Sequence, residues 1–499
     1  MKGGETMLGT NIGIDLGTSA MKLLLLDEKG HIKNSVSRSY PVCFPHPAWS
    51  EQSPEDWWNA CLDGIGELLN GFDASLVCGI GAGGQMHGLV VLDENDNVIR
   101  PAILWNDART ASEVDFLNEE IGKEKLSKLT ANIAFAGFTA PKILWMKNNE
   151  PENFARIKKI MLPKDYINYK LTGVHATDYS DASGMLLLDV ENKCWSKEML
   201  SLCDITEEQM PKLFESFDVI GTLCADSAKA LGLPENVKVV AGAGDNAAAA
   251  IGTGTVGGGN CNISLGTSGT IFISAKDFCV DSNNALHAFA HADGNYHLMG
   301  CMLSAASCNK WLCDEIFRTT DYAAEQKDIT SDMLGKNRVF FLPYLMGERS
   351  PINDTNARGT FTGMTMDTKR EDLVLAVLEG VAFAIRDSFE VAKKLGIEIP
   401  RSKICGGGAK SRLWCEIFAN VLGIPLDIPQ TEEGPGYGGA MLAMVGCGLY
   451  KDVNECVADL VKTTATVEPC AELSQRYEER YQKFKKIYPA MKDLFADMQ

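Results

Sequence analysis

The stretch IGIDLGTSAMKLLLL (residues 12–26) has a counterpart in CNISLGTSGTIFIS (residues 261–274). Each stretch places apolar segments on both sides of the turn LGTS, a pattern typical of two strands joined by a tight turn. A strand–turn–strand unit that occurs twice favours an internal duplication. We therefore predict two related halves, with a boundary near residue 256 in the glycine-rich run GTGTVGGGN (252–260).

The size and charge of the chain limit its class. Its 499 residues predict two or three domains. Hydrophobic residues make up 45% and charged residues 23%, which is typical of a soluble globular protein. The net charge of −19 argues against a nucleic-acid partner, which selects for basic surfaces. No apolar run approaches the roughly 20 residues that cross a bilayer, so we expect no membrane partner.

The cysteines and histidines give no sign of a disulfide framework or a metal site. The 16 cysteines are scattered through hydrophobic stretches without a CxxC pair, which favours reduced thiols in the cytoplasm. The seven histidines show no HExxH spacing. The first residues, MKGGETMLGT, lack the apolar stretch of a signal peptide, and we expect residues 1–10 to be a disordered leader.

Strands alternate with helices along the chain, which predicts an α/β fold. In the first half, residues 53–70 form a predicted helix, with Ser53 as N-cap, Pro54 at its first position and Asp56 at capping-box spacing. In the second half we expect a buried helix at 372–389 and a strand, glycine turn and helix at 404–423, the helix capped by Ser411. The charged, amphipathic segment 471–495 predicts a surface helix.

Two glycine turns are candidates for binding phosphate or nucleotide. In DLGTS (15–19), backbone N–H groups and hydroxyls suit a phosphate, and Asp15 suits Mg²⁺ bound through water. The alternative is an ordinary hairpin turn. GGGAKS (406–411) lies between a strand and a helix and allows a ligand to approach the backbone closely, but it has neither Walker nor Rossmann spacing.

Three further polar stretches leave two interpretations each. In AGAGDNAAAAIGTG (241–254), Asp245 either caps a helix or stands beside a ligand for which the small residues leave room. In GGQMHG (83–88), His87 is either bonded by the backbone or binds a ligand. WNDART (105–110) either lines a polar pocket or forms a surface ion pair between Asp107 and Arg109.

Longer strings resemble the FGGY family of carbohydrate kinases. Both signatures of that family occur as continuous strings, FTAPKILWMK (138–147) and GTFTGMTMDTKREDLVLAVLEG (359–380). LPYLMGERSPINDTNARG (342–359) and EGPGYG (433–438) also resemble members of the family that phosphorylate xylulose. The resemblance covers residues 11 to about 450.

The resemblance implies a duplicated actin-like (ribonuclease-H-like) ATPase fold with two domains and a central cleft. Residues 11–255 would be the sugar-binding domain, and residues 256–499 the nucleotide-binding domain with a terminal helix. The ligands implied are ATP, Mg²⁺ and a small-molecule sugar. Homodimers are frequent among relatives, so a homodimer is an expectation as well.

The resemblance also implies roles for individual residues. Asp245 would be the catalytic base, and Asp15 and Asp245 would bind the metal. The sugar would be bound by the loop GQMHG and by polar residues of the first half, namely Gln85, Met86, His87, Trp105, Asp107, Asp245 and Asn246. ATP would be bound by the two LGTS turns, by a neighbouring lysine and by the third glycine turn, namely Asp15, Gly17, Thr18, Ser19, Lys22, Gly266, Thr267, Ser268, Ala306, Gly406, Gly407, Gly408 and Ala409.

The expected activity is transfer of the γ-phosphoryl group of ATP to the 5-hydroxyl of D-xylulose. The string GQMHG favours this sugar over ribulose, gluconate or glycerol, which remain alternatives within the family. An actin-like nucleotide switch would share the phosphate turns but would not need GQMHG or the two signatures. A sugar-binding regulator without catalysis is disfavoured because Asp15 and Asp245 are both present.

Overall fold

The structure is a computed structural model that describes residues 9–430 and 433–498. Residues 1–8 of the expected leader lie outside the described residues, while Thr10, its last residue, already begins the first strand. No helix in the described part of the chain is long and apolar enough to span a membrane.

The chain alternates strands and helices throughout, as expected for an α/β protein. The strands are β1 Thr10–Leu16, β2 Ala20–Leu26, β3 Ile32–Ser39, β4 Glu51–Gln52, β5 Val77–Gly84, β6 Val90–Leu92, β7 Ala102–Ile103, β8 Lys159–Met161, β9 Ala176–Asp178, β10 Leu188–Asp189, β11 Cys194–Trp195, β12 Lys212–Phe214, β13 Val219–Thr222, β14 Lys238–Val240, β15 Ala243–Gly244, β16 Asn260–Leu265, β17 Gly269–Ala275, β18 His287–Ala290, β19 Tyr296–Met302, β20 Phe340–Leu342, β21 Thr360–Thr362, β22 Arg401–Cys405, β23 Leu426–Pro429 and β24 Thr463–Val467. The helices are α1 Pro54–Leu68, α2 Ala111–Asp115, α3 Lys123–Thr130, α4 Thr139–Asn149, α5 Pro151–Ala155, α6 Pro163–Thr172, α7 Tyr179–Ala182, α8 Lys197–Leu202, α9 Ala225–Leu231, α10 Asp245–Gly252, α11 Ala306–Trp311, α12 Tyr322–Gln326, α13 Arg370–Lys394, α14 Arg412–Leu422, α15 Gly434–Gly446, α16 Val453–Leu460, α17 Ala471–Phe484 and α18 Ile487–Asp497.

The chain forms two compact units. Of the described residues, unit 1 contains 9–257, 288–296 and 433–461, and unit 2 contains 258–287, 297–430 and 462–498. The first crossing, after Gly257, lies at the glycine-rich run where we predicted a boundary. A single boundary between residues 255 and 256 would let the chain cross between the units once. The chain crosses more often, because residues 433–461 return to unit 1.

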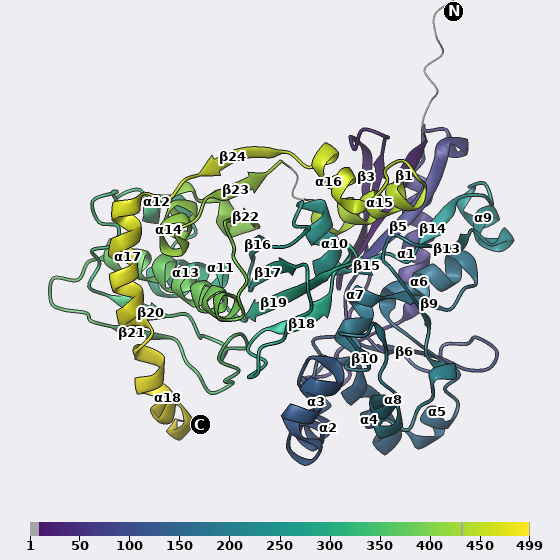
Figure 1. Cartoon of the computed structure of the whole chain (residues 1–499), viewed down its shortest axis with the longest axis horizontal. Helices are drawn as coiled ribbons and strands as arrows, with labels where there is room; N and C mark the ends of the chain where they lie inside the picture. Colours follow the sequence, from purple (N-terminus) through teal and green to yellow (C-terminus); the bar gives the residue numbers. More distant parts are fainter. Residues whose placement is uncertain (1–8, 431–432, 499) are drawn as a thin grey trace, which may run out of the picture. The chain divides into compact units, whose positions relative to one another are not determined.

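The two sheets confirm the predicted duplication. In unit 1 six strands follow the order β3-β2-β1-β5-β14-β13, and in unit 2 six strands follow the order β19-β17-β16-β22-β23-β24 (Figure 1). The hairpin β1–β2 and the hairpin β16–β17 are both antiparallel, and each LGTS turn lies at the hairpin's tip. Their first strands pair in parallel with β5 and β22 respectively. The repeated sequence therefore marks the same position in two equivalent sheets.

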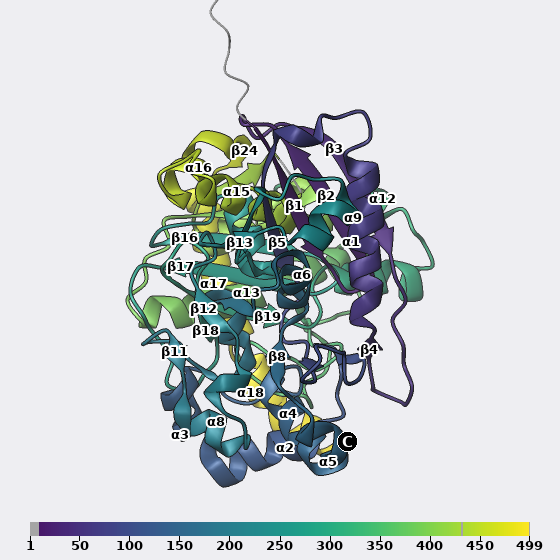
Figure 2. The same cartoon turned by 90° about the vertical axis from the view of Figure 1, so that its right-hand side faces the viewer.

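Helices cover both faces of the unit 1 sheet. Helices α1, α6 and α9 contact one another, and α1 packs on β2 and β3. On the opposite face α15 packs on β1 and β5, and α10 packs on α15. Figures 1 and 2 show yellow α15 beside purple β1, although these elements are far apart in the sequence. The sheet is thus the middle layer of a three-layer α/β/α unit.

Glycines allow α15 to approach its neighbours without intervening side chains. A Cβ atom on Gly13 of β1 would lie 1.9 Å from the carbonyl oxygen of Gly436, and a Cβ on Gly438 would lie 1.9 Å from that of Ala248 in α10. Real Cβ atoms do not approach oxygen so closely, so these positions require glycine. The string EGPGYG, which the sequence only linked to a family, is the segment that makes this packing possible.

Several predicted elements are confirmed and others are corrected. Helix α1 begins after Ser53 as expected, but the Ser53 side chain makes no capping bond. Ser411 caps α14 through a bond from the Trp414 N–H to its hydroxyl, at 3.2 Å. The predicted helix 471–495 is two helices, α17 and α18, which separate at Lys485 and Lys486.

Replacing Gly438 with alanine should destabilise the protein. The added methyl group would push α15 away from the backbone of α10, and overpacking of this kind costs about 1–3 kcal/mol. We expect the midpoint of thermal or urea unfolding to fall accordingly. The matched control is Gly66→Ala in α1, where a Cβ would meet nothing within 4 Å. That variant should gain up to about 1 kcal/mol from helix propensity. Equal midpoints for the two variants would contradict the close-packing argument.

Candidate functional site

Three neighbouring strands of unit 1 end at the same edge of the sheet. Asp15 near the end of β1 lies opposite Gly83 of β5, and Gly83 also lies opposite Ala243 of β15. Asp245 follows β15 as the first residue of α10. Because carboxyl ends of parallel strands meet at one edge, this register brings the two carboxylates and the GQMHG loop into one region.

The charge of Asp245 acts on the carboxyl group of Asp15. Burial raises the pKa of Asp15 to about 7, and the charge of Asp245 raises it too, while Lys22 opposes the rise. Burial raises the pKa of Asp245 to about 6 against the effect of two hydrogen bonds from Asn246. In these bonds the backbone and side-chain nitrogens of Asn246 donate to Asp245 Oδ1 at 2.7 and 3.0 Å. The N-cap of α10 is Gly244, so the helix-cap interpretation of Asp245 is wrong.

His87 adopts a backbone conformation that is unusual for a residue other than glycine. Its φ of +69° lies in the left-handed region, which costs free energy unless the surroundings hold it in place. The His87 Nδ1–H donates to the Gly184 carbonyl at 2.8 Å. Its ring also packs on Phe138, with centroids 4.8 Å apart. The backbone bond that one of the two sequence interpretations of His87 predicted is therefore present.

Two side chains of the first signature string, FTAPKILWMK, hold this loop through hydrogen bonds. Lys142 Nζ donates to the His87 carbonyl at 2.8 Å and to the Gly137 carbonyl at 2.6 Å, and the Thr139 hydroxyl donates to the His87 carbonyl at 3.1 Å. Lys142 is fully buried, and burial lowers its pKa to about 7 although Asp107 opposes this. Sequence reasoning quoted FTAPKILWMK as a family signature but did not recognise Lys142 and Thr139 as supports of the loop.

Gln85 and Met86, the other two predicted sugar-binding residues of the loop, are fixed by hydrogen bonds and by packing respectively. Gln85 Nε2 donates to Gln52 Oε1 at 3.1 Å, and the Gln85 backbone N–H donates to the Leu16 carbonyl at 2.8 Å. Met86 is almost fully buried, and its side chain packs where a Cβ on Gly244 would lie. The expected sugar loop therefore contacts both the turn after β1 and the residue before Asp245.

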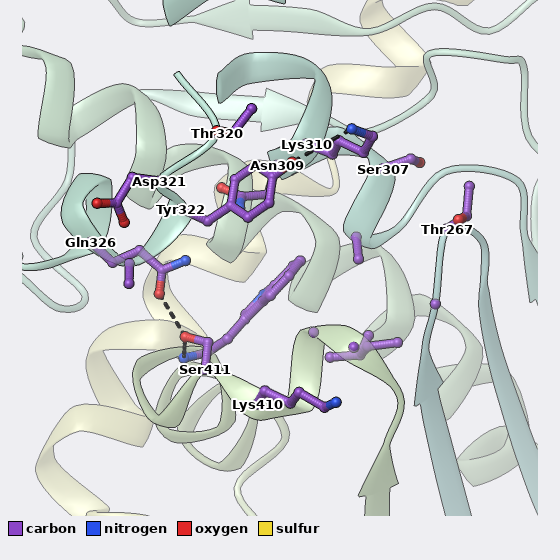
Figure 3. A pocket seen from close by; sticks show the side chains of 17 residues that line it. Thr267, Ser307, Asn309, Lys310, Thr320, Asp321, Tyr322, Gln326, Lys410 and Ser411 are labelled. Atoms are coloured by element: carbon purple, nitrogen blue, oxygen red, sulfur yellow. Dashed lines mark hydrogen bonds between the residues drawn. The ribbon is translucent and has the colours of Figure 1, made fainter. Parts of the chain in front are cut away.

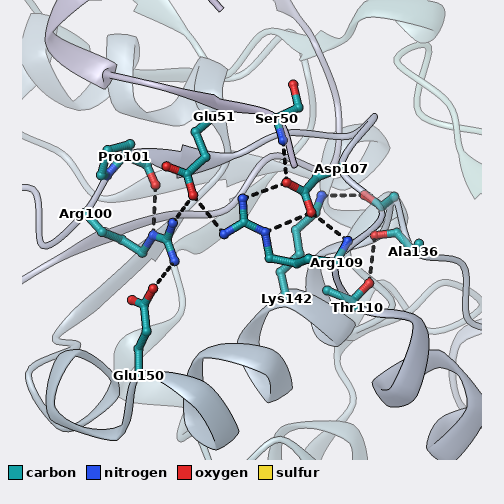
Figure 4. Close-up of polar contacts among 11 residues, drawn as sticks. Ser50, Glu51, Arg100, Pro101, Asp107, Arg109, Thr110, Ala136, Lys142 and Glu150 are labelled. Atoms are coloured by element: carbon teal, nitrogen blue, oxygen red, sulfur yellow. Dashed lines mark hydrogen bonds and ion pairs between the residues drawn. The ribbon is translucent and has the colours of Figure 1, made fainter. Parts of the chain in front are cut away.

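The stretch WNDART contains a buried ion pair. Arg109 Nε and Nη2 donate to the two oxygens of Asp107 at 2.9 and 2.7 Å, and the Ser50 N–H donates to Asp107 Oδ2 at 2.6 Å (Figure 4). The predicted Asp107–Arg109 pair exists, but it is buried rather than on the surface, with side chains 0% and 1% exposed. This arrangement favours a supporting role for Asp107, and its contact with a sugar stays a prediction. Trp105 is partly exposed and donates from Nε1 to the Thr18 hydroxyl at 2.9 Å.

The first LGTS turn is anchored on one side by donors from unit 1. The Tyr40 hydroxyl donates to the Gly17 carbonyl at 2.6 Å, and Gln52 Nε2 donates to the Thr18 carbonyl at 2.6 Å. Ser19 is exposed at the tip of the hairpin. Lys22, opposite Asp15 on β2, forms an ion pair with Glu433. A role for this turn in binding phosphate stays a prediction.

The second LGTS turn and the GGGAKS turn meet in unit 2. Gly406 has a φ of +87°, and a Cβ there would lie 2.8 Å from the backbone of Leu265, so the turn passes directly beside the end of β16. The carbonyls of Gly266 and Thr267 accept bonds from the N–H groups of Ala306 and Ala305, at 2.9 and 3.0 Å. Three predicted segments of the nucleotide site are thus adjacent in one unit.

These segments line a cavity of about 660 Å³ in unit 2, which falls within the usual range for small-molecule sites (Figure 3). Of the predicted nucleotide residues of unit 2, those that line it are Gly266, Thr267, Ala306, Gly407 and Gly408. Among the described residues, the lining of this cavity does not include Ser268, Gly406 or Ala409. Sequence reasoning missed most of the opposite wall, which includes Asn309, Lys310, Thr320, Asp321, Tyr322 and Gln326.

A hydrogen bond joins the cavity wall that the sequence did not predict to the GGGAKS turn, which it did predict. The Ser411 hydroxyl donates to Gln326 Oε1 at 2.6 Å across the cavity's edge (Figure 3). Trp414, which forms part of the lining, donates from Nε1 to the Leu378 carbonyl at 2.9 Å. The tight packing of α14 and α13 therefore holds one side of the cavity rigid. No sequence motif signalled residues 320–326, because they reach the cavity only through the tertiary fold.

Comparison with known proteins assigns the chain to a family. The models of the N-terminal and C-terminal domains of the FGGY family of carbohydrate kinases match residues 10–252 and 261–447. The chain belongs to the FGGY family of carbohydrate kinases. This membership confirms the resemblance and makes the protein a phosphotransferase that acts on a sugar hydroxyl, with ATP as the implied phosphoryl donor.

Relatives match this FGGY kinase over nearly its full length. The xylulose kinase of Escherichia coli K12 is 40% identical over 491 residues, which is 97% of this chain and 100% of that protein. The crystal structure of a "xyloylose kinase" from Brucella ovis is 39% identical, covers 97% of this chain and 100% of that one, and superposes with a TM-score of 0.93. A gluconate kinase from Lactobacillus acidophilus is 26% identical, covers 98% and 99%, and has a TM-score of 0.92. The expected two-domain, actin-like fold class is confirmed by these structures.

Asp245→Asn should stabilise the protein at alkaline pH. The folded-state pKa of about 6 lies above the ordinary value of 3.8, so ionisation of Asp245 disfavours the folded state as pH rises between these values. Each unit of such a difference corresponds to about 1.4 kcal/mol. Asparagine does not ionise. We therefore expect the variant's thermal midpoint to exceed that of the wild type at pH 8 and to converge with it below about pH 4. A midpoint difference independent of pH would contradict the raised pKa.

Gly407→Val should weaken ATP binding without destabilising the fold. A Cβ on Gly407 would meet no protein atom within 4 Å, yet this residue lines the cavity, so the larger side chain would take space from the ligand. We expect the dissociation constant for ATP, measured by calorimetry, to rise at least about tenfold, which is about 1.4 kcal/mol. Gly66→Val, in an equally open position of α1, is the control and should leave ATP affinity unchanged. Unaltered affinity in Gly407→Val would place the nucleotide elsewhere.

Proposed function

We propose that the protein is a xylulose kinase, which transfers the γ-phosphoryl group of ATP to the 5-hydroxyl of D-xylulose and yields D-xylulose 5-phosphate and ADP. The observation that carries this proposal is the 40% identity with the xylulose kinase of Escherichia coli over almost the whole of both chains. The loop GQMHG, with its fixed His87, supports a ketose as the acceptor.

Asp245 is suited to the role of general base. A sugar hydroxyl is a weak nucleophile, and its proton must be accepted as the phosphoryl group arrives. A pKa of about 6 leaves Asp245 ionised at neutral pH, and its Oδ1 is held by Asn246. Proton acceptance of this kind contributes about 10²–10⁴-fold to the rate. Asn246, His87 and Gln85 surround the same strand ends and would orient the sugar's other hydroxyls.

The nucleotide would occupy the cavity of unit 2. The backbone of Gly407 and Gly408 would approach the adenosine part, and the turn at Gly266 to Ser268 would contact phosphate oxygens. In unit 1 the turn Gly17 to Ser19 and the Lys22 ammonium group would supply further donors to phosphate. Phosphoryl transfer needs alignment and charge stabilisation more than covalent chemistry, and these residues would supply both.

The residues present fit a magnesium ion. No group of three or more His, Cys, Asp or Glu side chains that could hold a metal occurs in the described residues. The carboxyl groups of Asp15 and Asp245 nevertheless lie close enough for the charge of Asp245 to raise the pKa of Asp15. Mg²⁺ is commonly bound by one or two carboxylates with phosphates and water as its other ligands. Bound to Asp15 and Asp245, it would neutralise charge on the phosphate oxygens.

We also infer a cytoplasmic location, which is supported by the cysteines of the described residues, since none of them forms a disulfide bond. The homodimer frequent among relatives stays a prediction, to be tested by analytical ultracentrifugation.

A substrate panel tests the proposed function. ADP release with Mg²⁺-ATP should be fastest with D-xylulose among D-xylulose, D-ribulose, L-ribulose, gluconate, glycerol and no sugar. Asp245→Asn should lower kcat at least about 100-fold with D-xylulose, because the hydroxyl proton loses its acceptor. Fastest turnover with gluconate would assign the activity of the gluconate kinase that shares this fold. Slow hydrolysis unaffected by any sugar would overturn the kinase proposal.

A further inference from the structure

A buried lysine and three carboxyl groups form a cluster in unit 1, next to the chain segment that precedes Asp245. Lys164 Nζ on α6 is 2.7 Å from Asp165 Oδ1, 3.2 Å from Asp178 Oδ1 and 3.8 Å from Asp181 Oδ2, and all four side chains are 0–1% exposed. Burying charges costs desolvation free energy that ion pairing repays only in part, so a buried cluster of this kind is weak evidence for a purely stabilising role.

Lys164 also holds the chain segment that leads to Asp245. Its Nζ donates to the Ala241 carbonyl at 3.0 Å, and Asn168 Nδ2 donates to the same carbonyl at 2.9 Å. Ala241 lies between β14 and β15, and β15 ends directly before Asp245. A Cβ on Gly84 would lie 2.7 Å from the Lys164 Cβ, so Lys164 also packs against the start of the GQMHG loop.

A directional chain of hydrogen bonds links the cluster to the Gly244 peptide. Asp178 Oδ2 accepts bonds from the Ser180 hydroxyl, from the Ser180 N–H at 2.9 Å and from the Ser216 hydroxyl at 2.8 Å. Because the Ser180 proton points to Asp178, the Ser180 oxygen can accept the Gly244 N–H, at 3.2 Å. Gly244 is the residue before Asp245 and the N-cap of α10.

The Gly244 peptide keeps this direction fixed. A backbone N–H can only donate, so the Ser180 oxygen must accept the Gly244 N–H, and the Ser180 proton is then directed to Asp178 Oδ2.

We propose that Lys164, Asp178 and Ser180 are positioning residues that orient the catalytic carboxylate of Asp245 through the Gly244 peptide. The inference rests on the proposed role of Asp245 as the base. Lys164 fixes Ala241, which precedes β15. Asp178 fixes Ser180, and Ser180 fixes Gly244, the residue directly before Asp245. Positioning of this precision matters because small displacements of a reacting group reduce rates strongly.

Ser180→Ala tests the proposal, and Ser183→Ala is its matched control. Replacement of Lys164 would leave Asp165 and Asp178 unbalanced and could unfold the protein. Ser183 is equally buried, and its hydroxyl also accepts one backbone N–H, that of Ala290 at 3.0 Å, but it has no bond to Asp178 or Gly244. The two variants should therefore lose similar stability and differ in function.

We expect Ser180→Ala to lower kcat with D-xylulose about tenfold or more while the KM for ATP changes less than twofold. Ser183→Ala should keep kcat within about twofold of the wild type. Ser180→Thr, which restores the hydroxyl, should recover most of the kcat lost in Ser180→Ala. Equal kcat losses in the two alanine variants would overturn the proposal, since a merely structural role affects both alike.

Hydrogen exchange gives a readout that does not depend on kinase activity. Exchange of the Gly244 amide, followed by mass spectrometry of peptides that cover residues 241–252, should become at least about tenfold faster in Ser180→Ala and stay unchanged in Ser183→Ala. Unchanged exchange in Ser180→Ala overturns the positioning role even if the wild type phosphorylates D-xylulose. Faster exchange in a protein that phosphorylates no sugar supports the positioning of Asp245 and rejects the proposed function.

Discussion

The close approach of α15 to α10, β1 and β5 is the constraint on which unit 1 depends. Backbone meets backbone at Gly13–Gly436 and Gly438–Ala248, where no side chain would fit. This contact sets the height of α10 above the sheet and hence the position of its first residue, Asp245. It also places Gly436 beside Asp15, since a Cβ on Gly436 would lie 3.5 Å from the Asp15 Cβ. Two carboxylates thus depend on a helix that contributes no polar side chain to them.

Two buried lysines hold segments of unit 1 by donating hydrogen bonds to backbone carbonyl groups. Lys142 fixes the His87 and Gly137 carbonyls, and Lys164 fixes the Ala241 carbonyl. Lys142 therefore holds a loop in a conformation that its own residues do not favour, as the positive φ of His87 shows. An ammonium group has three donors and no acceptor, so it can join segments that a hydrophobic residue of equal size would leave apart.

The sequence predicted those features whose signals are local. The LGTS turns, the strands around them and the Ser411 cap follow from alternation and turn chemistry within a few residues. The segment 433–461 was not predicted to return to unit 1, because nothing local distinguishes a glycine-rich helix that packs on its own half from one that packs on the other. For the same reason the cavity wall at 320–326 and the burial of the Asp107–Arg109 pair were missed. Lys142 was visible as part of a long string, but its bonds to two carbonyl groups appear only in the folded chain.

The return of residues 433–461 to unit 1 has a consequence for synthesis of the protein. A ribosome releases β1 and β5 early, yet the helix that covers one face of their sheet is made only after residue 433. During most of translation that face has no native cover, and exposed apolar sheet surface of this kind favours aggregation. Unit 1 therefore completes its fold only after residues 433–461 have been synthesised.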